Sequence, residues 1–251
     1  MQRLAAIILA MLLGISPAVF APMQGRADPM PALGPEDRNA WMTVGLVNAA
    51  GYRGKASCTG TLIAPDLVLT AAHCASTIAG TGKKRHFVAG WDRGSFVAHR
   101  LSSEIHVHPG YISTTGNERF KYDIAVLQLE TPIDAAKVPP LPLSDAAPLR
   151  LGELAVLGYH RKRPNVINGR FDCVTQPQSS PVMVLLDCEV ISGNSGGPVL
   201  AQTGDDWTVV AVVAGRTGGN TPQALAVPVG DWVMSHWRDA MSRAEARRSE
   251  G

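Results

Sequence analysis

A serine among glycines is the first stretch of the chain whose residue types could do chemistry. In ISGNSGGPVL (191–200), Ser195 lies among Gly193, Gly196 and Gly197. A serine hydroxyl becomes a useful nucleophile only when a base takes its proton and backbone amides stabilise the oxyanion that forms. Because Gly193 has no side chain, its N–H can turn toward the same point as the N–H of Ser195, which makes these amides a candidate oxyanion hole. Taken alone, the stretch is equally compatible with a glycine turn between two strands.

Two other segments offer the base and the acid that such a serine needs. LVLTAAHC (67–74) runs from an apolar strand into a turn of small residues that presents His73, and YDIAVLQL (122–129) places Asp123 at the start of another apolar strand. Burying a carboxylate without a partner is expensive, so Asp123 needs a donor. A histidine N–H is the economical candidate, because the carboxylate then fixes the imidazole tautomer and stabilises its protonated form. The sequence therefore predicts Ser195, His73 and Asp123 as nucleophile, base and orienting acid.

The four cysteines indicate disulfides if the chain is exported. Sequence alone allows three pairings, of which we expect Cys58–Cys74 and Cys173–Cys188. Each would close a loop of about 15 residues, worth roughly 3 kcal/mol in the chain-entropy account of disulfide stabilisation. The competing hypothesis is a metal site of Cys58, Cys74 and His73, but no second close pair of ligands follows at zinc spacing. We therefore expect no metal at this turn.

The beginning of the chain is typical of a secretory signal. Arg3 is followed by the apolar run LAAIILAMLLGI (4–15) and then by small residues, with cleavage expected after Ala18 or Ala27. The alternative, a transmembrane anchor, needs roughly 20 apolar residues, and the run is well short of that length. We take residues 1–27 as the signal peptide and expect a secreted or periplasmic protein without a stable membrane anchor.

The charge balance argues against nucleic acid and anionic membranes as partners. The whole chain has 23 basic and 21 acidic residues, and removal of residues 1–27 takes away Arg3 and Arg26 but no acid. The mature chain is then about neutral and lacks the positive field that binds polyanions. We expect a monomer with no nucleic-acid partner.

Short apolar and β-branched runs separated by Gly, Pro, Asn and Asp predict an all-β chain. They fall on either side of the proline-rich stretch VPPLPLSDAAP (138–148), which suits a linker better than a paired strand. The first series is 43–47, 61–65, 67–72, 86–90 and 124–129, and the second is 154–159, 182–187, 198–200, 207–213 and 224–229. Residues 28–40 are expected to be a loose lead-in segment, and residues 231–251 a helix and tail. In that helix Asp231 would cap the first turn, with Val233, Trp237 and Met241 on one face.

Taken together, these motifs resemble the chymotrypsin/trypsin-type serine proteases. The resemblance rests on CTGTLIAPDLVLTAAHC (58–74), HVHPGY (106–111), YDIAVLQLETPI (122–133), GNSGGPVL (193–200) and WTVVAVVAG (207–215), in that chain order. It implies an all-β fold of two six-stranded Greek-key β-barrels, 41–139 and 140–230, followed by a C-terminal α-helix. His73 and Asp123 would come from the first barrel and Ser195 from the second. The implied activity is hydrolysis of polypeptide substrates through an acyl-enzyme, without a cofactor.

Two other functional hypotheses compete with this one. GNSGG (193–197) also satisfies the G-x-S-x-G pattern of α/β-hydrolases, but their chain order of serine, acid and histidine would leave only His236, in the terminal helix. The alternation of strands and helices that this fold requires is also missing. The second hypothesis is a secreted binding protein that keeps the protease scaffold without catalysis. An intact set of three catalytic residue types argues against it.

Asn194 departs from the animal digestive enzymes of the family. Those enzymes carry an acid at this position, which pairs with a new N-terminal ammonium after activation cleavage and shapes the oxyanion hole. An amide cannot form that ion pair, and GNSGG instead resembles the bacterial branch, with its glutamyl-endopeptidase-like and HtrA-like enzymes. We expect the chain from Asp28 onward to be active without a cut near Arg38.

The resemblance also suggests substrate-binding residues. Glu189 matches the floor of the primary specificity pocket, where an acid selects Lys or Arg, although strand alternation makes an outward carboxylate equally compatible. Ala214, Gly215 and Arg216 match the segment that pairs with an extended substrate backbone. Glycine is common at the third of these positions, so Arg216 would narrow the pocket or compete for Glu189.

His106 and His108 lie two residues apart and would share one face of a strand, which raises the possibility of a metal site. Because HPGY (108–111) reads as a turn, we interpret both histidines as surface residues.

Overall fold

Six antiparallel strands in the first half of the chain close into a barrel. In a computed structural model, which describes residues 29–51, 58–76, 83–148, 151–219 and 222–249, their order is β1-β2-β3-β6-β5-β4. The strands are β1 (Val44–Asn48), β2 (Cys58–Ala64), β3 (Leu67–Thr70), β4 (His86–Ala89), β5 (Ala98–Val107) and β6 (Ala125–Leu129). Buried apolar side chains such as Val47, Val68 and Phe87 fill this first barrel, as expected of β-branched and aromatic runs on a closed sheet.

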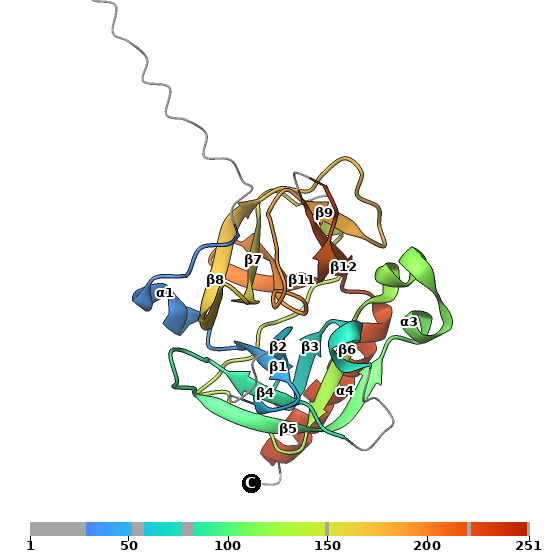
Figure 1. Cartoon of the computed structure of the whole chain (residues 1–251). Coiled ribbons are helices and arrows are strands. Elements are labelled where there is room, and N and C mark those ends of the chain that lie inside the picture. Colours follow the sequence, from blue (N-terminus) through green and yellow to red (C-terminus); the bar gives the residue numbers. More distant parts are fainter. Residues whose placement is uncertain (1–28, 52–57, 77–82, 149–150, 220–221, 250–251) are drawn as a thin grey trace, which may run out of the picture.

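The second half forms another six-stranded sheet, here called the second sheet, in the order β8-β7-β10-β11-β12-β9. Its strands are β7 (Leu154–His160), β8 (Arg163–Cys173), β9 (Val184–Leu186), β10 (Pro198–Thr203), β11 (Asp206–Arg216) and β12 (Ala224–Pro228). The edge strands β8 and β9 approach each other through the Cys173–Cys188 disulfide and a single bridge between Thr175 and Leu186. The fold class expected from the sequence is confirmed, with the difference that only the first barrel closes by continuous strand pairing (Figure 1).

The proline-rich linker holds the two halves together. The N–H of Leu141 donates to the carbonyl of Leu62 in the first barrel, and the carbonyl of Pro142 accepts from Val209 in the second sheet. A shared core, with Leu69 from one half and Leu157 from the other among its members, continues across the boundary. The halves are therefore packed against each other rather than tethered.

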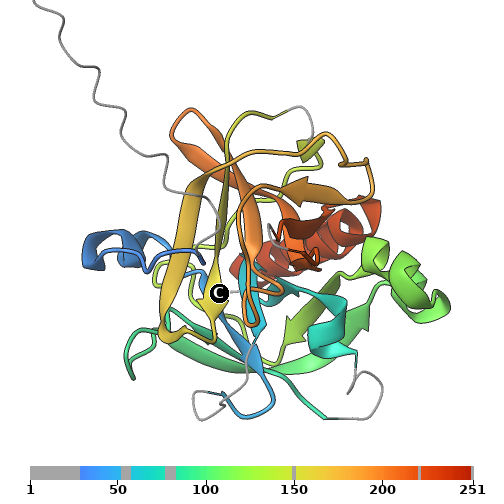
Figure 2. The ribbon, with the colours of Figure 1, turned by 45° about the horizontal axis from the view of Figure 1, so that its top comes forward.

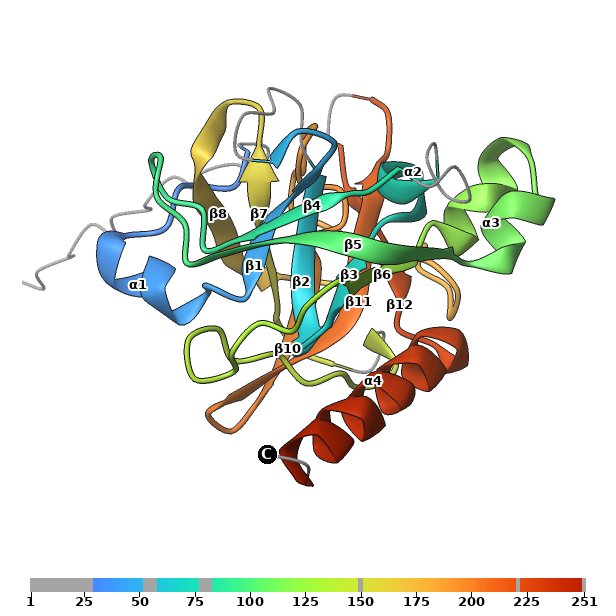
Figure 3. The same cartoon turned by 90° about the horizontal axis from the view of Figure 1, so that it is seen from below.

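The C-terminal helix α4 (Asp231–Ser249) follows the second sheet but lies along the first barrel (Figure 3). Trp237 Nε1 donates to the carbonyl of Ile63 at 2.8 Å, and Arg247 Nη2 lies 2.9 Å from Asp66 Oδ2. Among the described residues, no helix has the length and apolar character needed to cross a membrane. Three shorter helices, α1 (Pro35–Ala40), α2 (Ala72–Ala75) and α3 (Pro109–Ser113), and the 3-10 helix η2 (Gly116–Tyr122) complete the fold.

The lead-in segment is not loose, in contrast to the expectation from its prolines. Met30 is fully buried in the core of the second sheet. The carbonyl of Pro31 accepts from Gly169 at 3.0 Å, and the N–H of Leu33 donates to Ile167 at 3.1 Å, so the segment pairs with β8. Figures 1 and 2 both show this segment and α1 beside β8. The predicted signal peptide lies outside the described residues.

Candidate active site

His73 and Asp123 form a hydrogen-bonded pair in the first barrel. His73 lies in α2, directly after β3, and its Nδ1 is 2.7 Å from Asp123 Oδ2. Its backbone N–H also donates to Asp123 Oδ1 at 2.8 Å. With only 1% of its side chain exposed, Asp123 accepts from His73 at both oxygens. The carboxylate therefore fixes the tautomer with hydrogen on Nδ1 and leaves Nε2 as the basic nitrogen.

Strand register explains why two residues 50 positions apart meet. Asp123 ends η2 and stands just before β6, which pairs with β3 through Thr70 and Ala125. This pairing brings the residue preceding β6 next to the helical turn that follows β3. Tyr111 is packed nearby. Its pKa is raised mainly by burial and, to a smaller extent, by the negative charge of Asp123.

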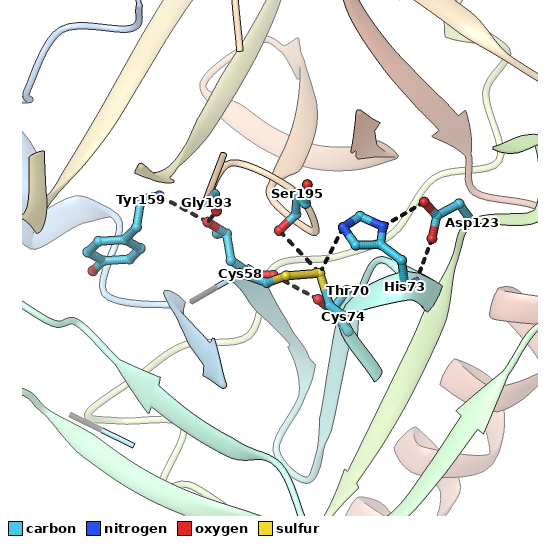
Figure 4. Close-up of a disulfide and its surroundings, with 9 residues drawn as sticks. Cys58, Thr70, His73, Cys74, Asp123, Tyr159, Gly193 and Ser195 are labelled. Atoms are coloured by element: carbon cyan, nitrogen blue, oxygen red, sulfur yellow. Dashed lines mark hydrogen bonds and ion pairs between the residues drawn. A yellow bond between two sulfur atoms is a disulfide. The ribbon is translucent and has the colours of Figure 1, made fainter. Parts of the chain in front are cut away.

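Ser195 belongs to the second sheet but is held by the first barrel. Its carbonyl accepts from the N–H of Thr59 at 2.8 Å and lies 3.9 Å from Cys74 Sγ. The same sulfur is 3.5 Å from His73 Nε2. Figure 4 shows the imidazole between the carboxylate of Asp123 and Ser195. Within the part of the chain that the structure describes, Ser195 Oγ makes no hydrogen bond, so the hydroxyl is free to rotate.

The glycines around Ser195 are required by close packing. Gly196 has φ +82°, and a Cβ there would lie 2.1 Å from the carbonyl oxygen of Thr59. Gly193 has φ +106°, and a Cβ there would lie 2.8 Å from the Cα of His160. These contacts show why both positions need glycine, because a side chain at either one would collide with the backbone of a neighbouring segment.

Two backbone amides beside Ser195 are available to a ligand. The carbonyl of Ser192 accepts from the N–H of Arg161 at 2.9 Å. Because C=O and N–H point in opposite directions across a trans peptide, this bond directs the N–H of Gly193 away from Arg161. Among the described residues, neither this N–H nor that of Ser195 has an acceptor. The pair has the chemistry of an oxyanion hole.

Asn194 is an amide because its site needs a donor as well as an acceptor. Its Oδ1 accepts from the N–H of Ile191 at 2.9 Å, and its Nδ2 donates to the carbonyl of Tyr159 at 3.2 Å. The residue is 1% exposed. A carboxylate could make the first bond but not the second. The loop before Ser195 is thus held by neutral hydrogen bonds.

Thr59 is a site residue that the sequence did not reveal. Besides its bond to Ser195, its Oγ1 donates to the carbonyl of Gly193 at 2.8 Å and accepts from the N–H of Tyr159 at 2.9 Å. The available signal was the pair of threonines in CTGTLIA (58–64), because a hydroxyl in a buried strand must find partners.

Both expected disulfides are present, and the first one bears on the metal hypothesis. Cys58 bonds to Cys74, and Cys173 bonds to Cys188. Ligand atoms of Cys58, Cys74 and His73 lie within 4.8 Å of one another. The two sulfurs are joined to each other, so they lack the thiolate charge that binds zinc. These residues therefore form a clamp at the turn of His73 rather than a metal centre.

The predicted specificity residues lie in the second sheet on two segments that β12 separates: Glu189 follows β9, whereas Ala214, Gly215 and Arg216 lie in β11. Glu189 is half-buried directly after Cys188, and in the described part of the chain no ion pair joins it to Arg216. Gly215 and Arg216 pair with β12 on one edge of β11. On the other edge the ladder of β11 with β10 ends at Val212, and both backbone groups of Val213 bond to Gly196 and Gly197. Within the described residues, an added strand could therefore pair with the backbone of β11 from Ala214 onward.

His106 and His108 do not come together, and both are half-buried. The His106 ring lies 4.7 Å from that of His236 in α4, whereas His108 stacks on Tyr122 at 5.2 Å and meets Trp232 at 5.1 Å. Both histidines are thus surface residues that α4 partly covers.

Comparisons with known proteins identify a family and a similar fold. The family model described as "Trypsin-like peptidase domain" matches residues 58–212. The peroxisomal leader peptide-processing proteases of Mus musculus and Homo sapiens are each 27% identical, over 168 and 175 residues, which is 66% of this chain. The chain spans only about a quarter of these curated relatives, 27% of their length. The crystal structure of the protease Anisep from Arthrobacter nicotinovorans has a similar fold, with a TM-score of 0.64 at 18% identity, over 79% of this chain and 95% of that chain.

Proposed function

Because this chain belongs to the family of trypsin-like peptidase domains, we propose that it is a serine endopeptidase that uses Ser195, His73 and Asp123. The observation that carries the proposal is the arrangement of the buried Asp123. Both of its oxygens bind His73, and the opposite nitrogen of that imidazole faces the disulfide on which the Ser195 loop rests. A structural histidine has no need of such a double contact with a buried acid.

The reaction follows from these positions. On substrate binding, the Ser195 hydroxyl turns toward His73 Nε2, gives up its proton and attacks the peptide carbonyl. Asp123 stabilises the resulting imidazolium, and the N–H groups of Gly193 and Ser195 bind the oxyanion. His73 then donates its proton to the leaving amine, which leaves an acyl-enzyme that water hydrolyses by the same steps in reverse order.

We further propose that the oxyanion hole needs no activation cleavage. The bonds of Asn194 to Ile191 and Tyr159 take the place of an ion pair with a newly made N-terminus. The bond from Arg161 to Ser192 supports an N–H of Gly193 that is already directed at the substrate. In this respect the loop fits the bacterial branch of the family, which remains a prediction.

A preference for Lys or Arg at the cleaved bond is the finer part of the proposal. It rests on Glu189, whose carboxylate has no ion-pair partner in the described part of the chain. A peptide library should show the preference in the wild type and its loss in Glu189→Gln. Equal cleavage after all residues would remove it. We also propose export, since two disulfides are typical of an oxidising compartment.

The decisive experiment is labelling with a fluorophosphonate probe, combined with hydrolysis of fluorogenic peptides. The wild type should be labelled and active, whereas Ser195→Ala should be neither. Ser192→Ala is the matched control, because that exposed serine lies in the same loop and contributes only its backbone carbonyl. If the wild type is neither labelled nor active, the chain is better described as a binding protein on a protease scaffold.

A further inference from the structure

The lead-in segment contacts the end of β7, the strand that holds the loop of residues 191–195. Met30 is fully buried in the second sheet, and its carbonyl oxygen lies 3.1 Å from His160 Nε2. Arg163 Nη1 donates to the same carbonyl at 3.3 Å. His160 is itself 1% exposed, at the end of β7. A buried imidazole N–H needs an acceptor, and the lead-in segment supplies it.

The chain neighbours of His160 hold the loop that precedes Ser195. Tyr159 accepts from Asn194 Nδ2 through its carbonyl, and Arg161 donates its N–H to the carbonyl of Ser192. The backbone of Gly193 packs directly on His160, whose Cα would lie 2.8 Å from a Cβ at that glycine. Residues 159–161, at and just beyond the end of β7, thus fix residues 192–194, whose peptide planes shape the oxyanion hole.

The ring of His160 is fixed at both nitrogens. Nδ1 accepts from the N–H of Arg163 at 3.2 Å, so the neutral ring carries its hydrogen on Nε2, which is directed at Met30. Loss of the carbonyl of Met30 would leave a buried donor unsatisfied beside the loop. Loss of the Met30 side chain would also leave a cavity in the core of the second sheet.

We propose that residues 29–33 are a positioning segment for the oxyanion hole, acting through the contact between the Met30 carbonyl and His160. The inference rests on the proposed function, since it concerns the same site. Displacement of the segment lets the end of β7 relax, which loosens the N–H of Gly193. The pair of His73 and Asp123, in the first barrel, is unaffected. The segment therefore controls kcat rather than substrate affinity.

Two substitutions at one position separate this role from simple packing. In His160→Asn the side-chain oxygen can still accept from Arg163, because it replaces Nδ1, but residue 160 no longer donates to the carbonyl of Met30, which keeps only the bond from Arg163 Nη1. In His160→Gln the longer amide places its nitrogen where Nε2 was and can still donate to Met30. His86→Asn is the control, because it removes a half-buried histidine in the first barrel that lies 2.7 Å from His99.

The first measurement is steady-state hydrolysis of a fluorogenic peptide by the full chain. His160→Asn should lower kcat about 10- to 100-fold and change KM less than about threefold. The loss in kcat should be smaller than the roughly 10²–10³-fold loss that follows removal of a whole oxyanion donor. His160→Gln should recover most of kcat, and His86→Asn should match the wild type. The pH midpoint of kcat/KM should not move, because the His73–Asp123 pair is untouched.

The second measurement is hydrogen exchange read by mass spectrometry, which does not depend on activity. In His160→Asn, exchange should accelerate in peptides covering residues 191–197 and remain unchanged in those covering residues 70–76. Wild-type kcat in His160→Asn, or acceleration spread equally over both regions, would overturn the proposal. A wild type without activity would refute the proposed function instead, and the exchange experiment would still decide the positioning role.

Discussion

Replacing Asn194 with aspartate puts a carboxylate into a site that requires an amide. The side chain is almost fully buried and bonds to two backbone groups, the N–H of Ile191 and the carbonyl of Tyr159. An ionised carboxylate keeps the first bond and loses the second, and it faces the carbonyl of Tyr159 with an oxygen. No cationic side chain bonds to Asn194 in the described structure, so the new charge has no partner.

The expected cost follows from these contacts. An unsatisfied buried acceptor costs about 1–3 kcal/mol, and an uncompensated buried charge about 3–5 kcal/mol. The second figure dominates, so Asn194→Asp should lower the free energy of unfolding by about 3–5 kcal/mol at pH 7. For a chain of this size, that corresponds to a fall in Tm of about 6–20 °C.

The loss of stability in Asn194→Asp should be smaller at acidic pH. Burial without a cation raises the pKa of a carboxyl in the folded state above its unfolded value. Stability is therefore lost as the pH rises through the folded pKa and regained below it, where the protonated group can donate to Tyr159. Melting curves of wild type and Asn194→Asp at pH 5 and pH 7.5 test this, with the exposed Asn165→Asp as control. Equal stability of Asn194→Asp and wild type at pH 7.5 would refute the account of the loop.

Two further predictions concern packing and pH. Gly196→Ala should lower the free energy of unfolding in urea by more than about 3 kcal/mol, because its Cβ would lie 2.1 Å from the carbonyl oxygen of Thr59. Gly204→Ala is the control, since that position has φ +62° but nothing within 4 Å, and it should cost about 1 kcal/mol. Similar losses of stability in the two variants would contradict this packing argument. Burial lowers the pKa of His86 and His99, and the charges of His86 and Arg100 lower the pKa of His99 further. Below about pH 6.5 the unfolded chain therefore binds more protons than the folded chain. The melting temperature should accordingly fall between pH 7 and pH 5, and it should fall less in His99→Gln than in the wild type. An equal fall in the two proteins would contradict this role of His86 and His99.

The sequence predicted those parts of the fold that depend on local pattern. The apolar runs correspond to strands in both halves, and the two disulfides pair as expected. The strands β5 and β8 were missed. In β5 the buried positions are Ser102 and Val107, and the other side chains are polar or partly exposed, so no apolar run marks it. In β8 the buried stretch from Val166 to Gly169 includes an asparagine and a glycine. Both strands depend on pairing with their neighbours rather than on their own composition.

Contacts between distant segments account for the rest. Nothing near Asn194 in the sequence indicates that Tyr159 is its partner, and nothing near Met30 indicates His160. The prolines of the lead-in segment correctly argue against a regular central strand, but they permit the short edge pairing with β8. Whether Ser195, His73 and Asp123 act as predicted remains for the labelling experiment.

Each end of the described chain packs on the half that is farther from it in the sequence. Residues 29–33 pair with the second sheet, and α4 lies along the first barrel. Neither half can therefore reach its final form from its own contiguous sequence. A nascent polypeptide that has released only its first 140 residues lacks the helix that covers Ile63 and Asp66, and it lacks Ser195 as well. The segments around His73, Asp123 and Ser195 can therefore take up their final arrangement only after helix α4 has been synthesised.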